Sequence, residues 1–338
     1  MAEIILKGQK IIDSVKILGR AQALSQGLAL DHSGTGFEMR ARFESDVDIE
    51  LSLTKEKDGC DRVYFTVYID GIRCEERYGV DVGECLLRID TPKDGESHVL
   101  RVVKQSESNY NLCDVYEIRF EGELLSPPEN KEKYIEYIGD SLSCGMGLLG
   151  RKGVEWPQTT LWEDVTQGYT YTSAQILNAD YSILSESGIG LAGSWFDPLF
   201  DFYSAYSYKR DKEVKYDFAR IPDLLIINLG TNDFYLNCDL KICSLEEVEQ
   251  KTKEFIELVR SSYGKQIPIL WVSRFMKVGG SYVDAIDKAI AALGGEEAKI
   301  YRLDVPTCAG GAQGHPDIEG HRIACEQVVD YVRKKNLI

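Results

Sequence analysis

The hydrophobic pattern changes along the chain, and this change constrains the fold more than any other feature of the sequence. Between about residues 37 and 123, apolar and polar residues alternate with a period of two, as in Phe37–Phe43, Val63–Tyr68 and Val115–Phe120. Such alternation is typical of strands that have one face in water. Turn signals such as Asp70-Gly71 separate these segments at short intervals. The pattern therefore predicts an antiparallel sandwich of the jelly-roll kind.

The alternation ends at Pro127 and Pro128, because paired prolines cannot continue a strand ladder. We therefore predict an all-β domain over residues 1–128 and a second domain over residues 129–338. In the second domain short apolar runs alternate with helical patterns, and the runs predict buried strands at Tyr134–Ile138, Tyr181–Leu184, Leu224–Leu229, Ile269–Val272 and Ile300–Leu303. This order is typical of a three-layer α/β domain with a parallel sheet.

One helix of this second domain has clear sequence signals for both ends. Ser244 and Glu247 have the spacing of a capping box, and Gly264 can end the helix. Apolar residues recur between them at helical spacing, so that one face is predicted to be buried.

The composition limits the class of partner. The formal charge of −16 and the pI near 4.8 argue against a nucleic acid or an anionic membrane as partner, since the field would repel phosphates. No run reaches the roughly 18 apolar residues of a membrane span, and residues 1–20 contain no signal-peptide core. The nine cysteines have no CxxC spacing, which favours reduced thiols and a cytoplasmic location.

Polar residues follow three of the predicted strands, at the edge where parallel sheets bind ligands. These segments are Gly139-Asp140-Ser141, Ser187-Gly188-Ile189-Gly190 and Gly230-Thr231-Asn232-Asp233. A serine between a strand and a helix can present its hydroxyl to a cleft, and the helix start offers free N–H groups to an oxyanion. Ser141 is therefore a candidate nucleophile, with helix capping as the alternative.

A serine nucleophile needs a base, and the chain has four histidines. His32 and His98 lie in the predicted β domain. His315 precedes a proline, which favours an extended loop conformation from which its ring can reach a cleft. His321 falls inside the predicted C-terminal helix, where packing is the commoner role. We therefore expect His315 to be the base.

The same strand ends offer donors for an oxyanion. The backbone N–H groups of Ser141 and Gly188 and the side-chain amide of Asn232 would form a hole with three donors. Glycine at position 188 lets a substrate approach the backbone closely. The alternative for Asn232 is a loop asparagine that bonds to its own backbone.

Taken together, Gly139-Asp140-Ser141, Gly188, Gly230-Thr231-Asn232-Asp233 and His315-Pro316 resemble the blocks of the SGNH (GDSL) hydrolases in order and spacing. With the preceding sandwich and the segments LDHSGTGF, EYIGDSLSCGMG, SESGIGL and NLGTND, the chain resembles carbohydrate esterase family 2. The resemblance implies a jelly-roll domain before an SGNH domain. It also implies an acetyl esterase that acts without a metal or other cofactor on hemicellulose sugars of the xylo or manno type.

One departure from the SGNH pattern concerns the acid of the triad. The positions two and three residues before His315 carry Gln313 and Ala312, where the family usually has an aspartate. Some members of family 2 use a Ser-His dyad in which a backbone carbonyl holds the imidazole N–H, and we predict the same here. Asp304, at a neighbouring strand end, is the acidic alternative, with a capping role equally open.

Trp195 and Phe196 follow Gly188 and are candidates for binding sugar rings, as is the cluster of Tyr203, Tyr206 and Tyr208; packing is the alternative for all of them. The expected partner is an acetylated oligosaccharide, imported if the protein is cytoplasmic. Another SGNH esterase or lipase activity and a non-catalytic carbohydrate-binding role stay open. So do the role of the β domain and assembly into a homo-oligomer.

Overall fold

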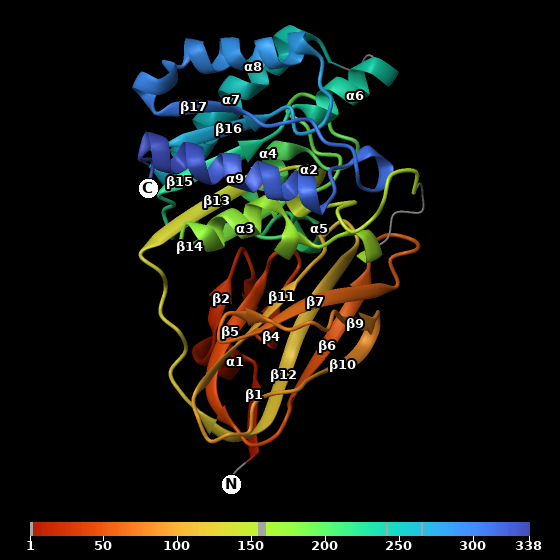
Figure 1. Ribbon diagram of the computed structural model, residues 1–338, viewed down its shortest axis with the longest axis vertical. Coiled ribbons are helices and arrows are strands. Elements are labelled where there is room, and N and C mark those ends of the chain that lie inside the picture. Colours follow the sequence, from red (N-terminus) through yellow and green to blue (C-terminus); the bar gives the residue numbers. More distant parts are fainter. Residues whose placement is uncertain (1–2, 155–159, 241–242, 265) are drawn as a thin grey trace. The chain divides into compact units, whose positions relative to one another are not determined.

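A computed structural model describes residues 3–154, 160–240, 243–264 and 266–338 of the chain. Its contacts divide the chain into two compact units (Figure 1). Unit 1 comprises Met1–Asn130 with Pro157–Leu161, and unit 2 comprises Lys131–Trp156 with Trp162–Ile338.

Unit 1 is built almost entirely of antiparallel strands. Its elements are β1 (Glu3–Lys7), α1 (Gln9–Ser14), β2 (Lys16–Leu18), β3 (Gln22–Leu24), β4 (Gly27–Ala29), β5 (Gly36–Phe43), β6 (Val47–Lys55), β7 (Arg62–Ile69), β8 (Ile72–Arg73), β9 (Tyr78–Asp81), β10 (Gly83–Ile89), β11 (His98–Lys104) and β12 (Asn111–Leu124). The central path of the sheet runs β10-β6-β12-β5-β11-β7-β8. The long strand β12 pairs with β6 along most of its length and with β5 near its end.

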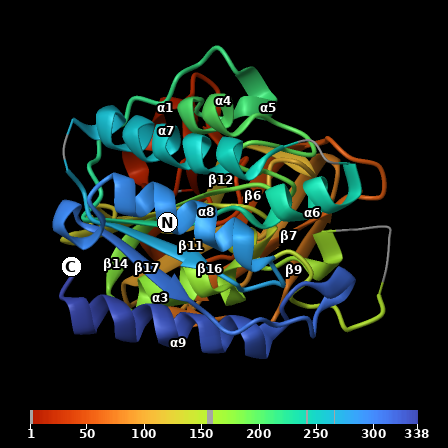
Figure 2. The same ribbon diagram turned by 90° about the horizontal axis from the view of Figure 1, so that it is seen from above.

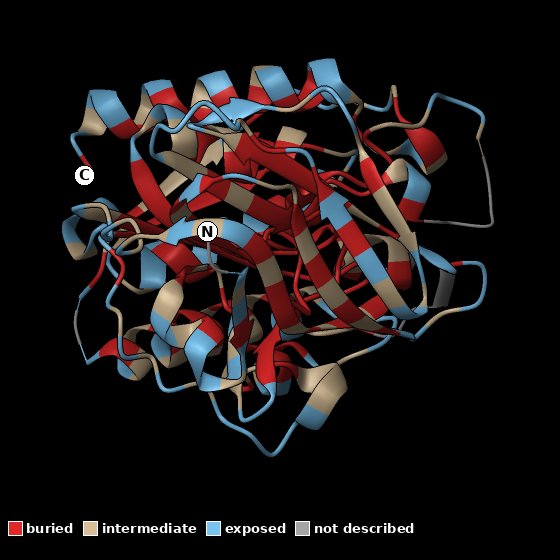
Figure 3. Cartoon of the chain, turned by 90° about the horizontal axis from the view of Figure 1, so that it is seen from below, coloured by how far each residue is buried: buried red, intermediate tan, exposed pale blue. Residues whose placement is uncertain are grey.

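The period-two pattern explains this sandwich. Along β6, Val47, Ile49, Leu51 and Leu53 are buried, while the residues between them are partly exposed. Figure 3 shows the same alternation of buried and exposed residues along other strands. One core of apolar side chains fills the interior of the unit. The antiparallel, jelly-roll-like fold predicted from the sequence is confirmed.

Unit 2 contains a parallel sheet with helices on both faces. Its strands are β13 (Lys133–Gly139), β14 (Ala179–Ser185), β15 (Leu224–Asn228), β16 (Ile269–Ser273) and β17 (Ile300–Asp304), in the order β14-β13-β15-β16-β17. Its α-helices are α2 (Ser141–Cys144), α3 (Tyr169–Ile176), α4 (Leu199–Ser204), α5 (Tyr208–Asp211), α6 (Thr231–Leu240), α7 (Leu245–Tyr263), α8 (Gly280–Ala292) and α9 (Ile318–Lys335). Figure 2 shows α3 and α9 on one face of the sheet and α7 and α8 on the other. The predicted three-layer α/β architecture is confirmed.

Helix α7 shows why the sequence signals worked in this unit. Both bonds of the capping box between Ser244 and Glu247 are present, and Gly264 ends the helix in the left-handed conformation. The buried face of α7 packs into the core of unit 2, together with Trp271 of β16, through Val248, Phe255, Ile256 and Val259. Helix and sheet are thus held by the apolar periodicity that is visible in the sequence.

Two global features bear on earlier expectations. Among the described residues, no helix has the length and apolar character that crossing a membrane requires. The eight cysteines whose side chains the structure describes all carry free thiols.

The loop that follows β14 is anchored at both of its ends. The ammonium group of Lys209 lies 2.6 Å from Asp197 Oδ2 and 3.9 Å from Glu186 Oε1. Through these ion pairs one lysine joins the two ends of the loop 186–197.

The middle of this loop is held by the buried carboxylate of Asp233 in α6. It accepts backbone hydrogen bonds from Leu191 at 2.8 Å, Ala192 at 2.7 Å and Gly193 at 3.1 Å. Burial raises the pKa of Asp233 above its usual value, while the three N–H groups lower it. The carboxylate therefore organises a turn that no regular secondary structure supports.

Replacing Asp233 with asparagine is expected to destabilise unit 2. The amide offers one acceptor oxygen where the carboxylate has two, and its NH₂ group would face buried N–H donors. An unsatisfied buried donor costs about 1–3 kcal/mol, so the urea midpoint of unit 2 should fall clearly. Asp330→Asn, the same change at an exposed position of α9, serves as control and should shift stability by less than about 0.5 kcal/mol. Equal effects of the two changes would contradict the proposed anchoring.

Candidate active site

Ser141 lies where strand β13 passes directly into helix α2. Asp140 caps this helix, because its Oδ1 accepts the Leu142 N–H at 3.0 Å. A side chain at Gly139 would meet Ser143 Oγ at 2.1 Å, so only glycine allows so abrupt a turn from strand to helix. The turn places Ser141 at the carboxyl edge of the parallel sheet, directly after β13, whose neighbours in the sheet are β14 and β15.

His315 comes from the loop before α9, and its Nε2 lies 2.9 Å from Ser141 Oγ. Its backbone is extended (φ −74°, ψ 162°), in keeping with the proline that follows. Helix α9 begins only after Asp317, which caps it through the Gly320 N–H at 2.9 Å. The structure thus brings the two residues singled out in the sequence into hydrogen-bond distance.

His321 has a different environment. It lies inside α9, fully buried, and its Nδ1 accepts the Tyr169 N–H at 3.2 Å. Its ring stacks on Tyr169 with 6.1 Å between the centroids. Burial lowers the pKa of His321 to about 3, so the ring is neutral and packs as part of the interior.

The loop that carries His315 is pinned to the segment that follows α2. Ala312 donates its N–H to the Gly147 carbonyl and Gln313 to the Val154 carbonyl, both at 3.0 Å. Gly147 has a φ of +75°, and a side chain there would lie 2.9 Å from His315 Cβ. The close approach of these two loops sets the position of the imidazole relative to Ser141.

Burial lowers the pKa of His315 to about 4, while the backbone carbonyls of Ala312 and Gln313 raise it by less. Its Nδ1 is buried, and no atom of the described residues lies in hydrogen-bonding geometry with it. Gln313 adopts a left-handed conformation with a φ of +54°. Burial and two backbone carbonyls are therefore the main influences on the pKa of this imidazole.

Asp304, the alternative acid, lies half-exposed at the end of β17. Its Oδ2 accepts from Arg274 Nε at 3.1 Å and its Oδ1 from Arg302 Nη2 at 2.7 Å. The structure thus gives this carboxylate to two arginines, and not to His315.

Gly188 and Asn232 are the other two residues that the sequence suggested as donors to an oxyanion. Gly188 has a φ of +87°, a conformation in which glycine is strongly favoured. Asn232 Nδ2 donates to the Ile189 carbonyl at 2.8 Å and, at 3.3 Å, to Asp140 Oδ2. The Asn232 amide is thus held by the segments that follow β13 and β14, and these two hydrogen bonds do not involve the Asn232 backbone. An incoming oxyanion would compete with the longer of these two bonds.

Trp195 and Phe196 are exposed to 43% and 54% and lie beside Gly188. The Trp195 N–H donates to the Gly188 carbonyl at 2.9 Å, and the Phe196 ring lies 2.9 Å from the position that a Cβ at Gly188 would take. Tyr203, in contrast, is fully buried and packs on Phe255 at 5.4 Å. The two exposed aromatic rings adjoin the site, whereas Tyr203 belongs to the core.

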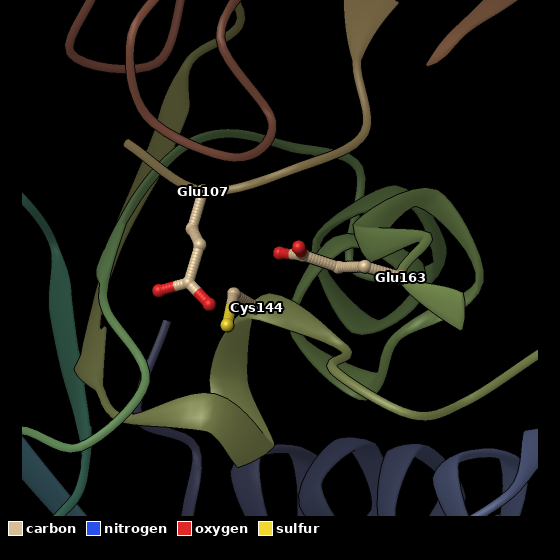
Figure 4. Close-up of side chains that lie close together, drawn as sticks. All are labelled: Glu107, Cys144 and Glu163. Atoms are coloured by element: carbon tan, nitrogen blue, oxygen red, sulfur yellow. The ribbon is translucent and has the colours of Figure 1, made fainter. Parts of the chain in front are cut away.

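The thiol of Cys144, in helix α2, lies 3.4 Å from the Ser141 carbonyl oxygen. A carboxylate oxygen of Glu163, also buried in unit 2, lies within 4.8 Å of this sulfur (Figure 4). Both side chains are of types that can bind a metal ion.

Sequence reasoning gave no role to Asp140 or Asp233, although both adjoin residues that it did select. The signal that could have identified them is an acidic residue shortly after a buried strand, since a buried carboxylate there must find donors nearby. The structure shows those donors, namely the Leu142 N–H for Asp140 and three loop N–H groups for Asp233.

The chain is similar in sequence to two curated proteins. The chain is 29% identical over 257 residues to the cellulase/esterase CelE of Acetivibrio thermocellus, a match that covers 71% of this chain and 30% of that protein. It is 28% identical over 150 residues to the acetylxylan esterase / glucomannan deacetylase of Cellvibrio japonicus, which covers 42% of this chain and 41% of that protein. Each match thus spans less than half of the curated relative.

Among solved structures, a family two carbohydrate esterase from Clostridium thermocellum, in complex with cellohexaose, superposes with a TM-score of 0.83. It is 23% identical and covers 96% of this chain and 100% of that chain, so the fold is shared over nearly the whole length. The sequence model of the GDSL-like lipase/acylhydrolase family matches residues 135–328, which include both Ser141 and His315. This chain belongs to the GDSL-like lipase/acylhydrolase family.

Proposed function

We propose that the protein is a carbohydrate O-acetyl esterase that removes acetyl groups from hemicellulose-derived oligosaccharides of the xylo or manno type. The observation that carries the proposal is the 2.9 Å contact between Ser141 Oγ and His315 Nε2 at the carboxyl edge of the sheet. Support for the substrate class comes from the two curated relatives, one called a cellulase/esterase and the other an acetylxylan esterase / glucomannan deacetylase.

In the proposed acylation step, Ser141 Oγ attacks the acetyl carbonyl carbon while His315 Nε2 accepts the hydroxyl proton. The carbonyl electron pair moves onto oxygen, where the N–H groups of Ser141 and Gly188 and the Asn232 amide bind the oxyanion. The sugar oxygen then leaves with the proton from His315. An acetyl-enzyme and a free sugar hydroxyl result.

In the proposed deacylation step, His315 removes a proton from water, and the hydroxyl attacks the acetyl-enzyme. Acetate leaves and Ser141 regains its proton. The imidazolium formed in each half-reaction is stabilised by the carbonyls of Ala312 and Gln313, whose effect on the ring is to raise its pKa. Backbone carbonyls thus take the role that a carboxylate has in a triad.

The free thiols of the described cysteines fit a reducing compartment. We therefore favour a cytoplasmic location and short oligosaccharides, rather than polymeric hemicellulose, as substrates.

The direct test is release of acetate from defined acetylated xylo- and manno-oligosaccharides. The intact protein should release acetate, and Ser141→Ala should reduce turnover at least about a thousandfold, because nucleophile and base act as a unit. Ser143→Ala is the matched control, since that hydroxyl lies in the same helix but bonds to Tyr169 at 3.0 Å. It should retain turnover. Undiminished acetate release by Ser141→Ala would exclude Ser141 as the nucleophile.

The pH dependence of kcat/KM is a second test. Catalysis needs the neutral imidazole, and burial lowers the pKa of His315 to about 4, below the usual value of about 6.5. Activity should therefore be lost only as the pH falls through about 4 and should be flat from about pH 6 upwards. The measurement is kcat/KM for acetate release between pH 3.5 and 8, within the range where the protein stays folded. A midpoint at or above 6.5 would contradict the buried, carbonyl-bounded imidazole.

A further inference from the structure

The loop that carries Gly188, Trp195 and Phe196 also borders a cavity. This cavity has a volume of about 310 Å³ and lies between residues 190–200 and Lys251 of helix α7. Ligand pockets in proteins begin at about 300 Å³, so the space suits one ring-sized group. Figure 2 shows α4 and α7 side by side here, and Phe200 packs on Phe255 at 5.6 Å.

The walls of the cavity combine aromatic faces with a few polar groups. Phe196 and Phe200 line it together with Ser194 and Lys251. The Lys251 ammonium lies 5.2 Å from the centre of the Phe200 ring and 2.6 Å from Glu254. Such a wall offers apolar contact to a flat C–H surface and hydrogen-bond donors to hydroxyl groups.

Hydrogen bonds within the protein hold the wall of the cavity in place. Leu191 and Ala192 line the cavity, and their N–H groups are held by the buried carboxylate of Asp233. The Ser194 hydroxyl accepts the Gly190 N–H at 3.1 Å. A wall fixed in this way loses little conformational entropy on binding, which favours affinity.

Phe196 connects the cavity with the candidate active site. Its ring lines the cavity and also lies 2.9 Å from the position of a Cβ at Gly188, one of the proposed oxyanion donors. A ligand that extends from Ser141 past Gly188 would meet the Phe196 ring, which also lines the cavity.

We propose that this cavity is a subsite for a pyranose ring of the acetylated glycan, next to the residue whose acetyl group lies at Ser141. The inference rests on the proposed function and adds the residues that would select chain length. A pyranose ring has an apolar C–H face for Phe200 and hydroxyl groups for Lys251 and Ser194. A long acyl chain fits less well, because it would remove water from the Lys251 ammonium without giving it a hydrogen bond.

The test compares Phe200→Ala and Lys251→Ala with Lys253→Ala. Lys253 lies on the same helix and pairs with Glu249, as Lys251 pairs with Glu254, but it does not line the cavity. For an acetylated trisaccharide, KM should rise about three- to tenfold in the two test variants, with kcat unchanged. For an acetylated monosaccharide and for 4-nitrophenyl acetate, all three variants should match the intact protein.

Calorimetric titration with unacetylated xylotetraose and mannotetraose separates this inference from the proposed function. Binding that is weakened by Phe200→Ala and Lys251→Ala supports the subsite even if no acetate is released from any sugar, a result that would overturn only the proposed function. Binding and KM values like those of Lys253→Ala would overturn the subsite. So would a rise in KM confined to long-chain 4-nitrophenyl esters, which would identify an acyl pocket. Lys251→Ala removes no core side chain and keeps the test decisive if Phe200→Ala unfolds.

Discussion

A hydrogen bond of 2.9 Å joins the Ser141 hydroxyl to the His315 imidazole, although the two residues are 174 positions apart in the sequence. Several features of unit 2 hold these two residues in place. The parallel sheet brings the end of β13 to one edge, and the turn at Gly139 points the serine out of it. The backbone hydrogen bonds from Ala312 to Gly147 and from Gln313 to Val154 fix the loop that carries His315. Because hydrogen bonds and close packing hold both segments, the contact is already formed in the structure without a substrate.

The second constraint is the absence of a carboxylate from the imidazole within the described residues. Asp304 is held by Arg274 and Arg302, and the groups that act on the ring are the carbonyls of Ala312 and Gln313. Burial lowers the pKa of the imidazole to about 4, because the carbonyl dipoles offset the desolvation less than a full negative charge would. The imidazole is consequently neutral at physiological pH, which is the form that its proposed role as the base requires.

The parts of the fold that follow apolar periodicity could be predicted from the sequence. All five buried runs became strands of the sheet, and the capping box of α7 is present. The loop 186–197 could not be predicted, since its shape depends on Asp233 and Lys209, which are distant from it in sequence. The left-handed Gln313 was equally invisible, because a glutamine gives no signal for that conformation. Local pattern thus predicted the scaffold, while polar contacts between separate segments shape the loops at the ends of its strands.

The activation of Ser141 by His315 is tested most directly by covalent labelling. A fluorophosphonate probe reacts with a serine only when a base activates its hydroxyl. At neutral pH the intact protein should carry one adduct, which mass spectrometry places on the peptide containing Ser141, and labelling should be strongly slowed in His315→Ala. Labelling of another residue, or an unchanged rate in His315→Ala, would contradict a Ser141-His315 pair as the catalytic centre.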